Sequence, residues 1–276
     1  MKRFAGGPLF IAIVISGAAL AWRLCGIGWG FPDVYEEATS VRKAWGFWGW
    51  DGKPFDFNPH FFNYPSFHFY LQFGVQAIVR LFGKLSGRVP DEAAFRAAYY
   101  LKPALFVGAG RFLTALLGSL SVFFLYWTGR RLGGARVAVP AALFLALHAV
   151  HVEKSRYVEV DVAMTFFVVL STFYLAGAAS GPARRGLFPG SAAIGLAAAT
   201  KYPGALFLLH VPMAAWLAGR PDPRRVLLAL LLAASVFAAA SPYVLLDRSA
   251  FLRDFGAESV HMQEGHFGGG GGGPLG

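Results

Sequence analysis

Two adjacent carboxylates, Glu36 and Glu37, are of a residue type that could do chemistry. They lie shortly after an apolar segment, in a stretch that is rich in aromatic residues. A carboxylate beside a substrate can remove a proton as a general base, or it can bind a metal ion. The alternative is a solvated acidic pair, because adjacent glutamates are common and their spacing alone is unspecific.

A second polar group runs from Ser155 to Asp161 and contains Arg156, Tyr157 and Glu159. Asp161 directly precedes an apolar segment. A carboxylate at the N-terminus of a helix caps free backbone N–H groups and is stabilised by the helix dipole. Capping is therefore a sufficient structural explanation for Asp161.

The histidines and the single cysteine give no firm metal or redox site. Near the C-terminal end the chain has His261 and His266, together with Glu258 and Glu264. Their spacing matches no recognised ligand geometry, so no cofactor is assigned from it, and a divalent metal ion is kept as an alternative. Cys25 is the only cysteine and cannot form an internal disulfide.

The elements that position these residues are transmembrane helices. Hydrophobic residues make up 56% of the 276 residues and charged residues only 14%, whereas soluble domains have about 25% charged residues. The composition predicts an all-α integral membrane protein with about seven spans, each crossing roughly 30 Å of hydrocarbon. The predicted spans are Pro8–Leu24, Phe112–Gly129, Val137–Val152, Val162–Ala179, Leu187–Thr200, Gly204–Ala218 and Val226–Leu245.

Positive charge predicts the orientation of these spans, because Lys and Arg concentrate in cytoplasmic loops. Basic clusters occupy alternate loops, and acidic residues fill the loops between them. The chain is expected in the plasma (inner) membrane with the acidic loops outside, and its net charge of +10 requires no nucleic acid partner. The basic clusters are Lys2-Arg3, Arg130-Arg131-Arg136, Arg184-Arg185 and Arg220-Arg224-Arg225.

A long outward loop, residues 26–110, is predicted between the first two spans. Within it, Tyr64–Phe82 is long enough to span, but polar residues recur at intervals of four and form one stripe on a helix. They are His68, Gln72, Gln76 and Arg80. We predict a helix that lies in the membrane interface. The alternative is an eighth span, which would break the alternation of loop charges.

Residues 1–247 are predicted to form one transmembrane module, and residues 248–276 an outward loop. That loop ends in a glycine run, Gly268–Gly273, which is typical of a flexible linker. We expect a truncated chain whose remaining spans are missing. The first span also has features of a cleavable signal peptide, but a retained anchor is favoured because the following chain is itself multispanning.

Arg156 and Lys201 break the inside-positive pattern, because both fall at the outer face. Cations at this level of a membrane can bind a phosphate group. The alternative is that their side chains extend to the phosphates of the surrounding lipids.

Several short segments also occur in a set order along the chain. They are Tyr35-Glu36-Glu37-Ala38, Asn63-Tyr64-Pro65, Leu81-Phe82-Gly83, Leu125–Gly133, Ser155–Asp161, Ala199-Thr200-Lys201-Tyr202 and His261–Phe267. Taken together they resemble membrane glycosyltransferases of the GT-C fold, in the superfamily of protein O-mannosyltransferases and lipid A aminoarabinose transferases. The resemblance covers nearly the whole chain, and it does not identify the substrate.

The resemblance implies transfer of one sugar from a polyprenyl-phosphate carrier to an acceptor on the outer membrane face, with inversion at the sugar carbon. The acceptor is a protein hydroxyl, a lipid or a glycan. Glu36 takes the place of the family's catalytic base, which is usually Asp; Glu is one methylene longer and can still reach. Glu37 matches the second acid and Asp161 an outer aspartate, so Glu36, Glu37 and Asp161 are the expected catalytic residues. Lys201 matches a lysine that faces the carrier phosphate. The residues expected to bind substrates are Arg156, Tyr157, Lys201, Tyr64, His261 and His266.

Two rival functions remain open from the sequence. A lipid or solute transporter usually places ionisable groups or broken helices near the middle of the bilayer. Here the acids gather on one face, and only His210 lies deep in a span. The second rival is a non-catalytic relative, because Glu replaces the usual Asp and the chain has a truncated look.

Overall fold

The computed structural model describes residues 7–31, 37–180, 186–219 and 222–264. Within these ranges every regular element is a helix, which confirms the predicted all-α class. The elements are α1 (Gly7–Leu24), α2 (Glu37–Gly46), α3 (Phe67–Leu85), α4 (Glu92–Leu101), α5 (Pro103–Gly133), α6 (Ala135–Leu147), α7 (Ala149–Lys154), α8 (Val160–Ser180), α9 (Leu187–Thr200), the 3₁₀ helix η1 (Tyr202–Leu209), α10 (His210–Leu217), α11 (Pro223–Ala240), α12 (Tyr243–Leu246) and α13 (Arg248–Glu264).

Four helices in the described ranges are long and apolar enough to cross a membrane: α1, α5, α8 and α11. They coincide with four of the runs predicted from the sequence. Three shorter apolar segments, α6, α9 and the continuous η1–α10, coincide with the other three. The structure therefore confirms apolar helices at all seven predicted runs, and the number that actually cross the membrane stays a prediction.

In two of the predicted runs, the helix ends before the predicted end of the run. The third run was expected to continue to Val152, but α6 ends at Leu147 because His148 has an extended backbone (φ −60°, ψ 113°). The last run was expected to continue past Ala240. Helix α11 ends there because Ser241 precedes a proline, and the residue before a proline disfavours the helical conformation.

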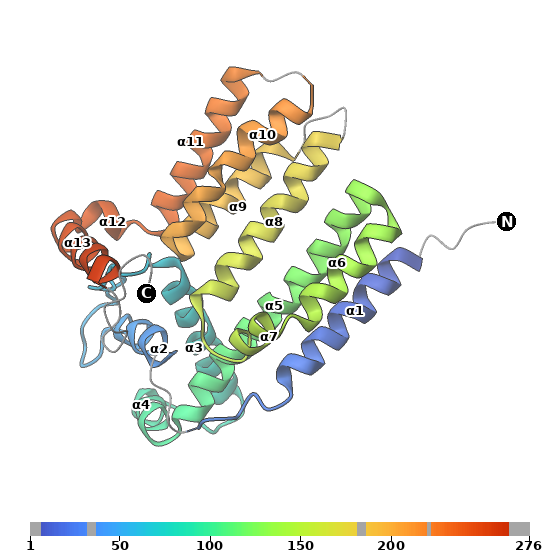
Figure 1. The fold of residues 1–276 in the computed structure, drawn as a ribbon. Coiled ribbons are helices and arrows are strands. Elements are labelled where there is room, and N and C mark those ends of the chain that lie inside the picture. The colour runs from blue at the N-terminus through green and yellow to red at the C-terminus, as the bar shows by residue number, and fades with distance from the viewer. Residues whose placement is uncertain (1–6, 32–36, 181–185, 220–221, 265–276) are drawn as a thin grey trace.

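The apolar helices α1, α5, α6, α8, α9, η1–α10 and α11 lie side by side, and the chain passes back and forth between the two ends of this bundle (Figure 1). Small residues allow close packing. A Cβ on Gly129 would lie 2.7 Å from the Cα of Ala138, and one on Gly195 would lie 2.5 Å from the carbonyl oxygen of Ala233. Such contacts are typical of helix packing in membranes, where small residues let the backbones approach closely.

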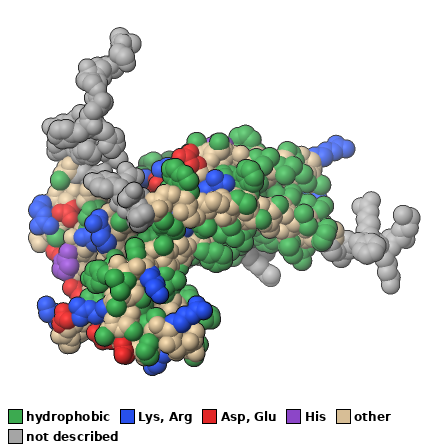
Figure 2. Space-filling model, turned by 90° about the horizontal axis from the view of Figure 1, so that it is seen from below, with side chains coloured by type: hydrophobic (Ala, Val, Ile, Leu, Met, Phe, Trp, Pro, Cys, Tyr) green, Lys and Arg blue, Asp and Glu red, His purple; other side chains and the backbone are tan. Residues whose placement is uncertain are grey.

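The two ends of the bundle differ. Helices α2, α3, α4, α12 and α13 gather at the end where α1 finishes and α5 begins (Figure 1). Figure 2 shows most charged side chains of the visible face at one end, while the rest of that face is largely hydrophobic. The basic turns at Arg130 and Arg225 join helices at the opposite end. Two of the four predicted basic clusters therefore lie at the end opposite the long predicted outward loop, and which end faces the cytoplasm stays a prediction.

The sides of the bundle expose large apolar side chains, as expected of a surface that contacts lipid. Examples are Phe10 and Ile13 on α1, and Leu227 and Leu231 on α11. No more than a small part of either helix is buried inside the protein. These two helices therefore present most of their apolar surface outward.

Helix α3 turns its polar stripe into the protein. His68, Gln72 and Gln76 are buried, whereas Leu81 and Phe82 are exposed. Helix α3 is not among the four candidate spans. Its exposed apolar face suits a membrane interface, and its orientation relative to the bilayer stays a prediction.

Residues 248–264, predicted as part of a loop, form helix α13. Asn58 Nδ2 donates a hydrogen bond to Asp247 Oδ2 at 2.8 Å, and the N–H of Phe62 donates to Asp254 Oδ2 at 3.1 Å. These bonds hold α12 and α13 against the segment that leads into α3. The predicted glycine run and the basic clusters at 2–3 and 184–185 lie outside the described residues.

Candidate functional site

A cavity of about 470 Å³ lies at the charged end of the bundle, beside the first turn of α2. Two acids line it, Glu37 of α2 and Glu159 just before α8, and Tyr64 joins them from the segment before α3. We call this cavity the Glu37 pocket. Its lining residues are Glu37, Thr39, Ser40, Arg42, Phe61, Asn63, Tyr64, Val158, Glu159 and Val160.

Glu37 is buried at the first position of α2. Arg111 of α5 binds both carboxylate oxygens: its Nε donates to Oε2 at 3.0 Å, and its Nη2 donates to Oε1. The backbone N–H of Val158 donates to the same Oε2 at 3.0 Å. A bidentate guanidinium–carboxylate pair is strong and fixes geometry. Glu37 therefore anchors the start of α2 to α5 and to the segment before α8.

Arg111 extends this anchor to a third segment. Its Nη1 donates to the carbonyl oxygens of Ile27 at 2.6 Å and Trp29 at 2.8 Å, just after α1. Arg111 was not identified from the sequence, because the predicted span began at Phe112, whereas α5 already begins at Pro103. A buried cation inside an apolar helix is costly unless it is paired, and this cost was the signal that could have identified Arg111.

Three predicted site residues meet beside the Glu37 pocket. Lys201 Nζ lies 2.6 Å from Asp161 Oδ1 and 5.9 Å from the ring centroid of Tyr64, which lines the pocket. Asp161 lies in the first turn of α8, and Lys201 lies between α9 and η1 with an extended backbone. Both charged side chains are partly exposed. A ligand can therefore reach this ion pair.

Arg156 and Tyr157 belong to a different cavity, of about 290 Å³, which we call the Arg156 pocket. Arg156 Nη2 donates to the carbonyl oxygen of Trp22, at the end of α1, at 3.0 Å. Arg111 also lines this cavity, while its partner Glu37 lines the other. The ion pair thus contributes to the walls of both pockets, and Arg156 and Lys201 have separate surroundings.

Arg23, in the last turn of α1, is fully buried and was not identified from the sequence. Its guanidinium donates to the carbonyl oxygen of Ala146 at 3.4 Å and to Ser155 Oγ at 3.3 Å, and it lies 2.9 Å from His151 Nδ1. These contacts tie α1 to the corner between α6 and α7. Arg23 therefore positions the segment that leads to Arg156.

The side chains of three predicted site residues are not among those that the structure describes. Glu36 and His266 lie outside the described residues, and His261 belongs to α13 without a described side chain. Among the side chains that the structure does describe, no group of three or more His, Cys, Asp or Glu could hold a metal ion. The metal alternative depended on His261 and His266, so it stays open.

The comparisons with known proteins identify a family. The family model described as dolichyl-phosphate-mannose-protein mannosyltransferase matches residues 81–221, slightly more than half of the chain. The match includes Arg111, Asp161 and Lys201, and it begins after Glu36, Glu37 and helix α2. No curated protein and no solved structure matches the chain.

Proposed function

The chain belongs to the dolichyl-phosphate-mannose-protein mannosyltransferase family, and from this premise we propose that its Glu37 pocket is where mannose passes to a protein hydroxyl group at the outer membrane face. Members of this family are membrane glycosyltransferases that depend on a polyprenyl-phosphate-linked sugar. The observation that carries the proposal is the pocket itself. Its volume of about 470 Å³ falls in the usual range of ligand sites, and two carboxylates and a tyrosine line it.

In the proposed reaction, the acceptor oxygen attacks the sugar carbon that is bonded to phosphate. The carbon–oxygen bond to phosphate breaks on the opposite side, so the configuration at that carbon inverts. The acceptor proton passes to the carboxylate of Glu36, and the polyprenyl phosphate leaves with the bonding electron pair. A base is needed because a hydroxyl group has a pKa far above neutrality. Nearby carboxylates also stabilise the oxocarbenium-like transition state.

Glu36 is favoured over Glu37 as this base for a structural reason. Both carboxylate oxygens of Glu37 are bound by Arg111, and one also accepts from the N–H of Val158. Taking a proton would weaken all three bonds. We therefore propose that Glu37 positions the start of α2, next to Glu36, and that Glu36 does the proton chemistry.

The leaving phosphate needs a cation, and we propose Lys201 for this role. Lys201 lies beside Tyr64 at the Glu37 pocket and is partly exposed. Its partner Asp161 keeps it in place before the donor binds. A fixed cation beside a leaving phosphate stabilises the charge that develops as the bond breaks.

Lys201→Met is expected to raise the KM for the donor roughly tenfold or more, because a hydrogen bond to a charged group contributes about 1.5–3 kcal/mol. The KM for the acceptor should change little. Arg156→Met should raise the donor KM less, because Arg156 lines the other cavity. Steady-state rates with the donor varied at saturating acceptor measure the donor KM of both variants. An unchanged donor KM in Lys201→Met would show that Lys201 does not bind the phosphate.

The orientation can be tested with impermeant thiol reagents on intact cells. After Cys25→Ser, single cysteines at Lys53 and at Arg225 mark the two ends of the bundle, and both positions are exposed. We expect labelling from outside at position 53 and none at 225, because basic turns remain in the cytoplasm. Labelling at 225 alone would reverse the orientation and move the proposed reaction to the inner face.

The reaction itself is tested with purified full-length protein in nanodiscs, radiolabelled polyprenyl-phosphate mannose and a peptide that contains Ser and Thr. We expect label on the peptide and an equal amount of released polyprenyl phosphate. A transporter would instead move label across sealed vesicles without joining it to the peptide. That outcome would contradict the proposed function.

A further inference from the structure

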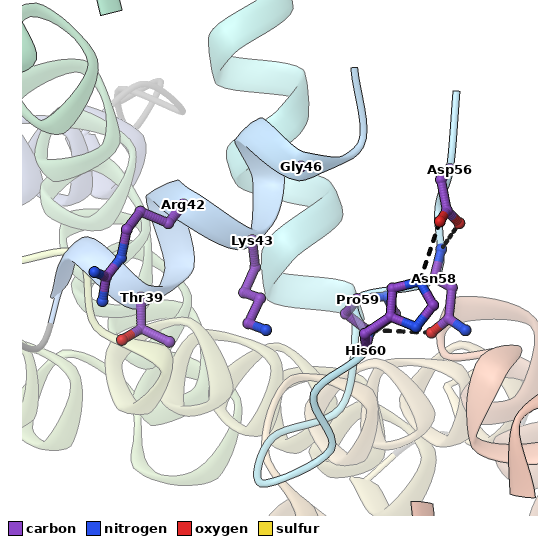
Figure 3. A pocket seen from close by; sticks show the side chains of 8 residues that line it. All are labelled: Thr39, Arg42, Lys43, Gly46, Asp56, Asn58, Pro59 and His60. Atoms are coloured by element: carbon purple, nitrogen blue, oxygen red, sulfur yellow. Dashed lines mark hydrogen bonds and ion pairs between the residues drawn. The ribbon is translucent and has the colours of Figure 1, made fainter. Parts of the chain in front are cut away.

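A third cavity, of about 480 Å³, lies farther along helix α2 (Figure 3). Thr39, Arg42, Lys43 and Gly46 form its α2 wall. They recur at intervals of three and four residues, so they share one face of the helix. Figure 3 shows Lys43 extending between Arg42 and Thr39 on one side and the turn from Asn58 to His60 on the other. We call this cavity the Lys43 pocket.

The wall opposite α2 is a turn whose polar groups already have partners. Asp56 Oδ1 accepts from the N–H of Asn58 at 2.9 Å, and Asp56 Oδ2 lies 3.1 Å from His60 Nε2. The bond from Asn58, followed by the one from His60, lowers the pKa of Asp56 below its ordinary value. The backbone N–H of His60 also donates to Asn58 Oδ1 at 3.1 Å. Asp56 keeps its negative charge in this wall, but its two carboxylate oxygens bind Asn58 and His60, and among the described residues neither oxygen forms an ion pair with Lys43.

The α2 wall of this pocket carries two cations, Arg42 and Lys43. Among the described residues, neither Arg42 nor Lys43 forms a hydrogen bond or an ion pair, although the Lys43 ammonium lies 5.0 Å from the ring centroid of Phe61. Burial lowers the pKa of Lys43; the charge of Asp254 opposes this shift, and Arg42 adds to it. An anion that enters the pocket can relieve both the lost hydration and the repulsion.

We propose that the Lys43 pocket binds an acidic side chain of the acceptor polypeptide, about three residues away from the hydroxyl group that receives the sugar. This inference rests on the proposed function and names the kind of acceptor. Thr39 and Arg42 line both the Glu37 pocket and the Lys43 pocket, so the two cavities adjoin along α2.

The spacing follows from the geometry of the helix. From Glu37 to Lys43 the helix rises roughly 9 Å, at about 1.5 Å per residue. An extended peptide covers that distance in about three residues, at about 3.3 Å each. An acceptor whose hydroxyl group enters the Glu37 pocket therefore places the side chain about three residues away at Lys43, where an acidic side chain can bind. A lipid head group has no such link to a reacting hydroxyl group, which favours the polypeptide.

The test compares matched peptides with full-length protein in nanodiscs of neutral phosphatidylcholine. Each peptide has one Thr and either Asp or Asn three residues away, with one series on each side of the Thr. With polyprenyl-phosphate mannose as donor, we expect the Asp peptide of one series to have a KM about five- to tenfold lower than its Asn counterpart, the scale of one charge-assisted contact. Lys43→Gln should reduce this ratio to about one, and Lys43→Glu should favour a Lys-containing peptide.

Lys84→Gln is the matched control, because Lys84 is exposed near the end of α3 and lines neither pocket. It should keep the preference for Asp. Equal KM values for Asp and Asn peptides in both series would overturn this inference while leaving the proposed function intact. A preference that persists in Lys43→Gln, or a Lys43 effect that needs added phosphatidylglycerol and not the peptide's Asp, would also overturn it. Absence of transfer to every peptide would contradict the protein acceptor itself, and this inference with it.

Discussion

Glu36→Gln is expected to reduce sugar transfer by about 100-fold to 10,000-fold, the usual cost of losing a general base. Gln keeps the length of the side chain and its hydrogen-bonding capacity, but it cannot accept the acceptor's proton. Expression, membrane insertion and donor binding should stay close to those of the unmodified protein. Single-turnover transfer rates measured alongside donor binding separate the chemical step from assembly.

The matched variant for this prediction is Glu36→Asp, which restores the residue usual in the families that the sequence resembles. It should keep measurable activity if the acceptor can move closer by one methylene. A fully active Glu36→Gln together with an inactive but stably folded Glu37→Gln would assign the base to the other carboxylate. If both glutamine variants transferred sugar normally, neither acid would be the base, and the glycosyltransferase mechanism proposed for this pocket would fail.

Hydropathy was enough to predict the elements of the bundle. Helices α1, α8 and α11 are long apolar runs, and each begins within a few residues of its predicted start. The point at which a helix ends depends on local features that hydropathy does not report. His148 has an extended backbone and ends α6, and the proline after Ser241 ends α11. The proline was visible in the sequence, but the apolar run continued past it, whereas the backbone conformation of His148 is seen only in the structure.

The contacts between distant segments could not be predicted in the same way. From the sequence, Asp161 was predicted as a helix cap or a catalytic acid and Lys201 as a phosphate ligand, each without reference to the other. The structure joins them in an ion pair at 2.6 Å. Such a pairing depends on how α8 packs against α9, which the pattern of one sequence does not determine. Arg23 was missed for a similar reason, because its partners lie on α6, α7 and the segment after them.

Glu37→Gln and Arg111→Met are each expected to destabilise the folded protein by about 3–5 kcal/mol, because removing one partner of a buried ion pair leaves the other charge without compensation. Both side chains are almost completely buried, and the pair joins α2 to α5. The double variant should recover part of the loss, since it leaves no unpaired charge. Chemical or thermal unfolding in detergent measures the three variants against the unmodified protein.

The control for this prediction is Arg96→Met, because the pair of Arg96 with Asp51 is exposed and should matter little. The variants of Glu36 and Glu37 are expected to differ in stability. Glu36→Gln should lose the reaction and keep stability, whereas Glu37→Gln should lose stability and, through the displaced start of α2, activity as well. If Glu37→Gln unfolds like the unmodified protein and yet fails to transfer sugar, Glu37 takes part in the chemistry directly, and the anchoring role proposed for its bond to Arg111 is wrong.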